Sequence, residues 1–81
     1  MYSVYILLCI DQSLYTGISN DPEKRLIDHK NGKGAAYTRS HTPVKIVYLE
    51  KCGTKSAALK REAQIKRWTR EEKIKTLNLS F

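Results

Sequence analysis

The sequence predicts an α+β fold with a small, mainly antiparallel sheet. Two short apolar runs separated by only three polar residues open the chain, a third apolar run follows near its middle, and the last third is rich in helix formers. With 81 residues, the chain is too short to build two independent hydrophobic cores. We therefore expect one domain over residues 1–81.

Two strands that form a hairpin are expected at the amino terminus. Residues 2–10 are mostly β-branched, aromatic or aliphatic, which is typical of a buried strand. Residues 14–18 form a second strand pattern after the polar stretch at residues 11–13. A connection this short favours an antiparallel hairpin.

The first helix is expected to begin at the Asn-Asp-Pro-Glu segment of residues 20–23. This segment supplies a capping side chain, a proline near the first helical position and an acidic first turn. The helix should run to about Lys30, where an Asn-Gly pair ends it. Residues 31–44, which contain two glycines and a proline, are predicted to be a loop, and residues 44–49 a third strand.

Two further helices are predicted after a turn at residues 52–54. Residues 57–68 are rich in helix formers and should make the main helix. Thr69 and Glu72 match a capping box that opens a short last helix. The predicted order is β-β-α-β-α-α, and the apolar tail at residues 77–81 is expected to pack back on its own domain.

The charge pattern indicates a polyanionic partner. The chain has 15 Lys and Arg against 8 Asp and Glu, a formal net charge of +7, and the first twenty residues contain no Lys or Arg. The cations are interspersed along the chain, which favours a folded basic face over a disordered arm. Nucleic acid is the favoured partner and an anionic membrane surface the second, while a solvated surface with a surplus of Lys is the alternative.

Several protein classes are disfavoured. The longest apolar run, residues 4–10, is far shorter than the roughly 20 residues of a membrane span. The amino terminus lacks the positive segment of a signal peptide, so we expect a cytoplasmic protein. Cys9 and Cys52 are too few for a disulfide framework and are expected to be free thiols.

Five side chains form a set suited to phosphodiester hydrolysis. Tyr5 and Tyr15 lie ten residues apart on the two strands of the hairpin, Arg25 and His29 share one helix face, and Glu62 is the sole acid among the cations of the main helix. Hydrolysis needs an activated water, a counter-charge at phosphorus and help for the leaving oxygen.

Each member of this set has a task in that chemistry. Glu62 can hold one divalent cation, Mg²⁺ or Mn²⁺, because Mg²⁺ commonly uses one or two carboxylates and fills its shell with water and phosphate. Arg25 offers a forked donor pair to phosphate, and His29 can transfer a proton or bind phosphate. A tyrosine, with a reference pKa of about 10, serves as base only if the cation or basic neighbours stabilise its phenolate. We expect the basic site to do so.

The same residues carry a resemblance to a known family. Val4-Tyr5-Ile6, Tyr15-Thr16-Gly17, Arg25, His29 and Glu62 together resemble the GIY-YIG nuclease domain over almost the whole chain. The segments at residues 13–17, 34–39 and 61–66 look closest to small stand-alone bacterial members that are similar to the catalytic domain of the DNA-repair excinuclease.

The resemblance implies a three-stranded antiparallel sheet flanked by helices and a single divalent metal held by Glu62. In some members the tyrosine matched by Tyr5 is proposed as general base, and in others the one matched by Tyr15 activates water or binds phosphate, so the identity of the base stays open. Arg25 matches an arginine that stabilises developing charge, and His29 a histidine found in part of the family. The downstream asparagine of several members has no clear counterpart: Asn78, sixteen residues after Glu62, is the nearest.

Other residues are candidates for contact with nucleic acid. Gly17 allows a close approach beside Tyr15 or marks a bulge, Tyr37 and Arg39 line a nucleic-acid groove or order their loop, and Lys66 belongs to a diffuse surface that attracts phosphate.

The catalytic candidates have structural alternatives too. The two tyrosines are ordinary packing residues if the chain is no nuclease, Arg25 then pairs with Asp21 or Asp28, and Glu62 neutralises Lys66.

Two functions follow from these observations. The first is a metal-dependent endonuclease that hydrolyses nucleic-acid phosphodiesters, with DNA as the expected substrate. The alternative is a nucleic-acid-binding module that keeps the fold but has little or no activity without a partner. No separate DNA-binding domain is recognisable, so a protein partner is a candidate source of specificity.

Overall fold

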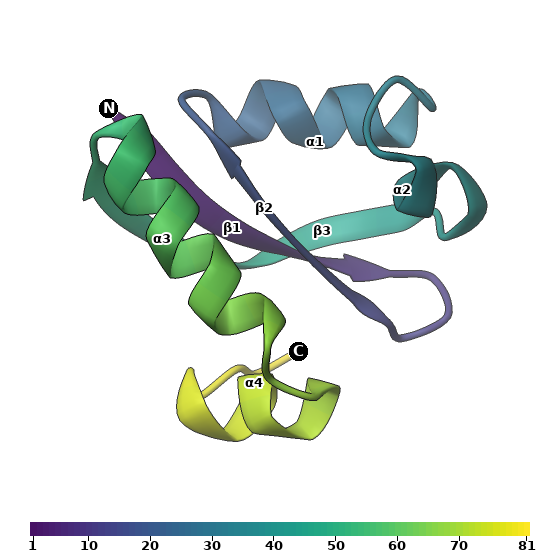
Figure 1. Cartoon of the computed structure of the whole chain (residues 1–81). Helices are drawn as coiled ribbons and strands as arrows, with labels where there is room; N and C mark the ends of the chain where they lie inside the picture. The colour runs from purple at the N-terminus through teal and green to yellow at the C-terminus, as the bar shows by residue number, and fades with distance from the viewer.

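The computed structural model describes residues 1–81, and a three-stranded antiparallel sheet with strand order β2-β1-β3 forms its centre (Figure 1). The strands are β1 (Tyr2–Cys9), β2 (Leu14–Ser19) and β3 (Pro43–Gly53), and the helices are α1 (Pro22–Lys30), α2 (Ala36–Ser40), α3 (Lys55–Lys66) and α4 (Arg70–Thr76). The predicted α+β class with a small antiparallel sheet is confirmed.

Strand β1 is central and is buried on both faces. Every residue of β1 after Tyr2 is at most 7% exposed. The strand pairs with β2 on one side and β3 on the other, while α1 and α3 lie on opposite faces of the sheet (Figure 1). Full coverage explains why this strand is a continuous apolar run and not an alternating one.

The hydrophobic core lies between the sheet and α3. Val4 and Ile6 of β1 pack with Ala58 and Ile65 of α3, and all four are fully buried. Trp68, Leu77 and Leu79 pack against this cluster, so the carboxy-terminal tail folds back on its own chain as expected. Because strand side chains alternate between faces, Tyr5 points away from this core and toward α1.

Helix α1 is the element that carries Arg25 and His29. Its N-cap is Asp21, whose side chain accepts a hydrogen bond from the Lys24 amide at 3.3 Å, and Pro22 occupies the first helical position. The helix ends at Lys30, where the sequence predicted its end. His29, in its last turn, is the buried residue of the helix.

The segment predicted as a loop, residues 31–44, contains a short helix, and the loop prediction is wrong there. Helix α2 has five residues, and its N-cap Ala35 supplies no capping side chain, so the sequence carries no start signal for it. It is held by tertiary contacts of Thr38. The observed order is therefore β-β-α-α-β-α-α.

Other boundaries differ from the prediction as well. Strand β3 extends to Gly53, well beyond residue 49, because its pairing with β1 continues to the start of that strand. Helix α3 starts at Lys55, since the Thr54 side chain caps it by accepting a hydrogen bond from the Ala57 amide at 3.1 Å. The capping box predicted at Thr69 and Glu72 is present at the start of α4.

Two chain-wide features complete the fold. Both cysteines are free thiols, with Cys9 buried and Cys52 half-buried. The longest helix, α3, has 12 residues, and none of the helices has the length and apolar character of a membrane span.

Candidate active site

A buried tyrosine and a buried histidine meet on the α1 side of the sheet. The Tyr5 hydroxyl of β1 lies 2.8 Å from Nε2 of His29 in α1. The other ring nitrogen of His29, Nδ1, lies 2.6 Å from the hydroxyl of Thr38 in α2. Tyr5 and His29 are each 1% exposed and Thr38 is 2% exposed. Three elements thus contribute to one buried row of hydrogen bonds.

Two glycines make room for these rings. A Cβ atom at Gly17 would lie 2.6 Å from the Tyr5 hydroxyl oxygen, and one at Gly34 would lie 2.1 Å from Nδ1 of His29. Gly17 is the residue directly opposite Tyr5 in the pairing of β1 with β2. The close approach predicted at Gly17 is therefore present, and the group that approaches is the Tyr5 ring.

Tyr15 on the edge strand β2 closes the site on its outer side. Its ring centroid lies 6.5 Å from that of Tyr5 and 5.1 Å from that of His29. On its other side it stacks with Tyr37 of α2 at 5.9 Å, and Tyr37 stacks on His41 at 4.0 Å. The fold thus brings together three of the predicted catalytic residues and one predicted nucleic-acid contact.

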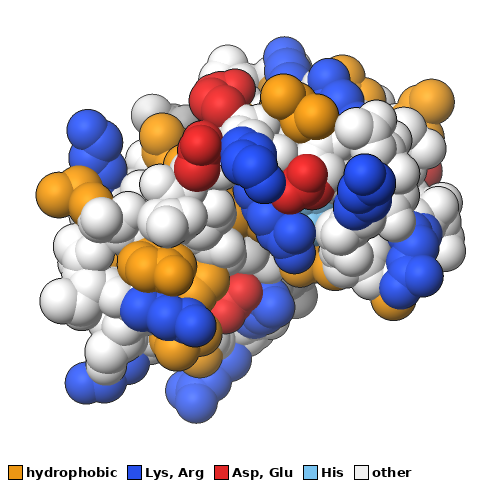
Figure 2. All heavy atoms as spheres, turned by 90° about the horizontal axis from the view of Figure 1, so that it is seen from above, with side chains coloured by type: hydrophobic (Ala, Val, Ile, Leu, Met, Phe, Trp, Pro, Cys, Tyr) orange, Lys and Arg blue, Asp and Glu red, His pale blue; other side chains and the backbone are white.

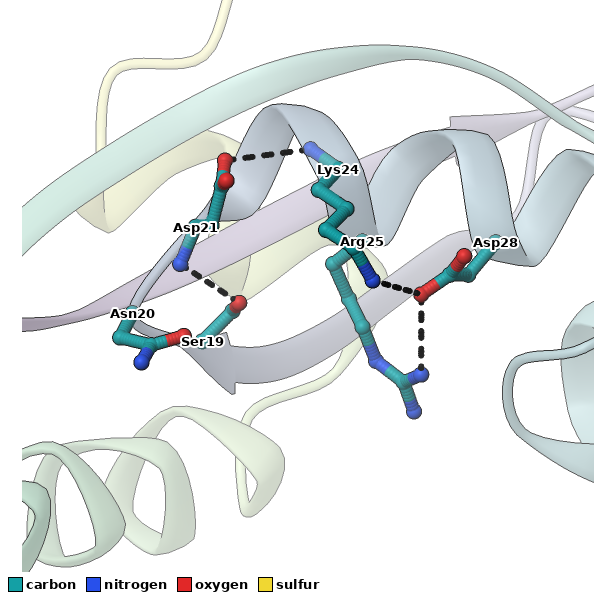
Figure 3. Close-up of a pocket in the computed structure, with 6 residues that line it drawn as sticks. All are labelled: Ser19, Asn20, Asp21, Lys24, Arg25 and Asp28. Atoms are coloured by element: carbon teal, nitrogen blue, oxygen red, sulfur yellow. Dashed lines mark hydrogen bonds and ion pairs between the residues drawn. The ribbon is translucent and has the colours of Figure 1, made fainter.

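Arg25 lies one helical turn before His29, next to a polar hollow at the start of α1 (Figure 3). The hollow has a volume of about 150 Å³ and is lined by Ser19, Asn20, Asp21, Lys24, Arg25 and Asp28. Nη1 of Arg25 lies 3.8 Å from Oδ2 of Asp28, and Nζ of Lys24 lies 3.7 Å from the same oxygen. The Arg25–Asp28 ion pair is one of the structural alternatives expected from the sequence. The Arg25 side chain is still 37% exposed, so it remains accessible to an anion.

Glu62 approaches the site from α3 together with Lys66. Its side chain is 18% exposed, and its Oε2 lies 3.2 Å from Nζ of Lys66. That same ammonium lies 5.8 Å from the centroid of the Tyr15 ring. The expected Glu62–Lys66 pair therefore forms, and it lies beside Tyr15.

Burial sets the protonation states of the central pair. Burial raises the pKa of Tyr5 to about 12, and the nearby hydroxyl of Tyr15 acts in the same direction, while Arg25 opposes it. Burial also lowers the pKa of His29, and the positive charge of Arg25 lowers it further. Near neutral pH the pair is a phenol and a neutral imidazole. Arg25 acts on the pKa of Tyr5 in the direction expected of basic surroundings, but burial has the larger effect.

The donor set around Glu62 fits a metal ion held by a single carboxylate. The structure has no group of three or more His, Cys, Asp or Glu side chains that could form a metal cage. The Glu62 side chain is largely buried, whereas that of its partner Lys66 is 50% exposed, and the Lys66 ammonium places a cationic group at this carboxylate. Mg²⁺ commonly binds through one or two carboxylates and takes its other ligands from water and phosphate.

The remaining predicted contacts lie on the α2 side of the molecule. Arg39 is exposed on α2, separated from Tyr37 in sequence by Thr38, and takes no part in the buried hydrogen bonds. Seen from above α1, Lys and Arg side chains are spread over the surface and acidic side chains lie among them (Figure 2). The cations on this side of the molecule thus belong to the folded surface, as the sequence predicted.

Sequence reasoning missed two residues of the site, Thr38 and Gly34. Both lie in the segment at residues 34–39, which carried part of the family resemblance, but neither has a chemistry that stands out alone. Their importance comes from contact with His29, a residue that precedes them by nine and five positions. Asn78, in turn, has a positive φ of 54° just after α4, where asparagine commonly terminates a helix.

Comparison with known families decides the relationship. The GIY-YIG catalytic domain family matches residues 1–78 of the chain. The chain belongs to the GIY-YIG family. Domains of this family typically use a divalent metal and have a nuclease-like fold.

Relatives cover nearly the whole GIY-YIG chain. A UPF0213 protein of Staphylococcus saprophyticus is 52% identical over 75 residues, 93% of this chain and 92% of the relative. A UPF0213 protein of Haloquadratum walsbyi is 54% identical over 70 residues, 86% of this chain and 79% of the relative.

Two solution NMR structures share the GIY-YIG fold observed here. One is a UPF0213 protein of Bacillus halodurans, with a TM-score of 0.60, 37% identity and coverage of 96% of this chain and 84% of that chain. The other is a protein of E. faecalis, with a TM-score of 0.65, 40% identity and coverage of 95% and 82%.

Proposed function

We propose that this chain is a divalent-metal-dependent endonuclease that hydrolyses phosphodiester bonds in nucleic acid, with DNA as the expected substrate. The observation that carries the proposal is the buried hydrogen bond of 2.8 Å between Tyr5 and His29. The Tyr15 ring lies beside both of these side chains, and Arg25 precedes His29 by one turn of α1. In a GIY-YIG fold, this arrangement supplies a base, a cation for phosphate and a carboxylate for metal in one place.

Tyr5 acts as the base of this site with His29 as its proton acceptor. A free Tyr5 phenolate is unfavourable near neutral pH, because burial raises the pKa of Tyr5 to about 12. If the Tyr5 proton moves to Nε2 of His29 as the hydroxyl takes a proton from water, the Oη–H bond of Tyr5 breaks and an Nε2–H bond forms. An O–H bond of the water then breaks and a new Oη–H bond forms on Tyr5. The pair thus removes one proton from water and ends as phenol and imidazolium. We therefore propose Tyr5 as the base, whose identity the sequence left open.

Arg25, Tyr15 and Glu62 complete the proposed chemistry. Arg25 stabilises the charge that develops on the phosphate, since its forked donors are still accessible to an anion. Tyr15 lies between the Tyr5–His29 pair and Tyr37, where it can orient water or phosphate. Glu62 would hold Mg²⁺ or Mn²⁺, which supplies Lewis-acid polarisation of the phosphate and stabilises the leaving oxygen.

The test measures the rate of nucleic-acid cleavage by wild type and by Glu62→Gln while Mg²⁺ or Mn²⁺ is titrated in. The substrates are RNA and single-stranded, duplex, flap and branched DNA. Glu71→Gln is the matched control, because it removes the same charge at an exposed position on α4. We expect metal-dependent cleavage by wild type and by Glu71→Gln, and a loss of about 100-fold or more in Glu62→Gln. Equal cleavage by all three proteins would indicate a contaminating nuclease and contradict the proposal.

The alternative function is a nucleic-acid-binding module that cleaves only with a protein partner or not at all. It is favoured by the net charge of +7, which attracts phosphate without any catalytic carboxylate. Salt-sensitive binding that is equal in wild type and Glu62→Gln, without cleavage of any substrate in the panel, would support this alternative over the nuclease.

A further inference from the structure

Thr38 is buried at the far end of the row of hydrogen bonds, away from Tyr5. Its hydroxyl oxygen lies 3.0 Å from the backbone carbonyl oxygen of Ala35 and 2.6 Å from Nδ1 of His29. A carbonyl oxygen can only accept a hydrogen bond, so Thr38 donates its single hydroxyl hydrogen to Ala35. Toward His29 the same hydroxyl must then accept.

This direction fixes which ring nitrogen of His29 carries the hydrogen. If Thr38 accepts, Nδ1 is the protonated nitrogen. The pKa of His29 is lowered by burial, so the ring is neutral and carries only one N–H group. Nε2 is then an acceptor, and the Tyr5 hydroxyl, 2.8 Å away, donates to it. The carbonyl of Ala35 thereby orients every hydrogen bond up to Tyr5.

Gly34 holds the ring in the plane that these bonds require. A Cβ atom at residue 34 would lie 2.1 Å from Nδ1 and 2.6 Å from both Cγ and Cε1 of His29. The backbone of Gly34 therefore lies directly against the imidazole. Residues of α2 and of the segment before it thus control both the position and the tautomer of a side chain that belongs to α1.

We propose that Thr38 is a positioning residue that keeps His29 in the Nδ1–H tautomer, so that Nε2 is available to accept the proton of Tyr5. This inference rests on the proposed nuclease function for its catalytic consequence. When the Tyr5 Oη–H bond breaks and the Nε2–H bond forms, the resulting imidazolium keeps its Nδ1–H bond to Thr38. The Thr38 oxygen therefore accepts from His29 both before and after the transfer. In the opposite tautomer Nε2 already carries a hydrogen and cannot accept another.

The first test reads the tautomer directly and needs no activity. Nitrogen chemical shifts of the imidazole rings are measured by long-range ¹H–¹⁵N correlation NMR on the full chain, with His41→Gln used to assign the two histidines. Wild type and Thr38→Ser should show a protonated Nδ1 and an unprotonated Nε2 for His29, and Thr38→Val, which keeps the shape without the hydroxyl, should show a shift toward the other tautomer. An Nε2–H tautomer in wild type, or an unchanged tautomer in Thr38→Val, would overturn the proposal.

The second test measures cleavage under the conditions that give wild-type activity. Thr38→Val should cleave about 10- to 100-fold more slowly, the effect typical of losing a group that orients a functional histidine, and Thr38→Ser should restore the rate to within about threefold of wild type. Wild-type rates in Thr38→Val despite a changed tautomer would refute the catalytic role of Thr38 and leave the nuclease standing. An inactive wild type would defeat the nuclease, while the NMR result would still decide the tautomer.

Discussion

Burial gives His29 properties that a histidine on a helix surface lacks. The sequence placed it on one face of α1 with Arg25, where a solvated imidazole would bind phosphate or exchange protons with water. In the structure both ring nitrogens are occupied by the hydroxyls of Tyr5 and Thr38. A direct contact of His29 with substrate is therefore disfavoured, and the role that we propose for His29 is that of a proton partner for Tyr5.

The burial of His29 predicts a pH dependence of stability. Its pKa is lowered in the folded state, so as pH falls below the unfolded value of about 6.5 the unfolded chain binds a proton that the folded chain does not. The stabilising contribution is therefore complete above about pH 6.5 and is lost as pH falls toward the folded pKa. Urea unfolding at a series of pH values from about 7.5 to about 5 should show this loss.

Substitution of each histidine in turn tests whether His29 is the group responsible for this pH dependence. His41 is the other histidine of the chain, so the unfolding of His41→Gln is measured beside that of His29→Gln. His29→Gln should flatten the slope of unfolding free energy against pH whatever its overall stability. A slope that is the same in His29→Gln as in wild type would show that His29 is not the titrating group.

At the scale of elements, the site depends on helix α2, which is stabilised mainly by tertiary packing and only weakly by its own sequence. Helix α2 spans five residues and lacks a capping side chain, and isolated helices of this length are unstable in water. Thr38 and Gly34 connect it and its approach segment to the end of α1. The site therefore joins β1, β2, α1 and α2 on one side of the sheet, and α3 contributes Glu62 and Lys66 past the edge strand.

Gly34→Ala should disturb this junction. The added Cβ atom would lie 2.1 Å from Nδ1 of a buried ring, so either the ring or the backbone must move. We expect a loss of about 1–3 kcal/mol in unfolding free energy, the usual cost of overpacking, and altered ring resonances of His29. Chemical denaturation and NMR of the ring measure the two effects.

Gly53→Ala is the matched control for this substitution. Gly53 has a φ of +87° and open space around its Cβ position. Alanine there is destabilising through the backbone alone, and the His29 resonances should stay in place. Unchanged stability and unchanged His29 resonances in Gly34→Ala would contradict the close packing described here.

At the scale of the whole molecule, the basic surface predicts salt-dependent binding to nucleic acid. Each phosphate contacted on duplex DNA contributes about −0.9 to the slope of log K against log salt concentration. Arg39 is exposed on α2, the helix that also carries Tyr37, so Arg39→Ala should reduce the magnitude of that slope by about 1. Fluorescence anisotropy at several salt concentrations measures it.

The control for this prediction is Lys75→Ala. Lys75 is exposed on α4, a helix that lies apart from α2 (Figure 1). Its removal should leave the slope close to that of wild type. If Lys75→Ala reduced the slope as much as Arg39→Ala, binding would be spread over the whole surface and not directed to the α2 side.

The sequence by itself determined the elements and the chemical types of the site residues. Apolar runs, the Asp21 and Thr69 caps and the charge pattern are local signals, because propensity and hydrogen bonding between near neighbours produce them. They predicted the sheet, three of the four helices and the family resemblance, with Tyr5 and Tyr15 on paired strands and Arg25 near His29.

Only the tertiary structure decided the surroundings of those residues. The neutral state of His29, the raised pKa of Tyr5 and the tautomer assigned through Thr38 all depend on burial and on contacts between residues far apart in the chain. Helix α2 has no local start signal, and Gly34 becomes necessary only because the His29 ring packs against it. Desolvation and close packing are properties of the assembled fold, and for that reason no local pattern in the sequence reveals them.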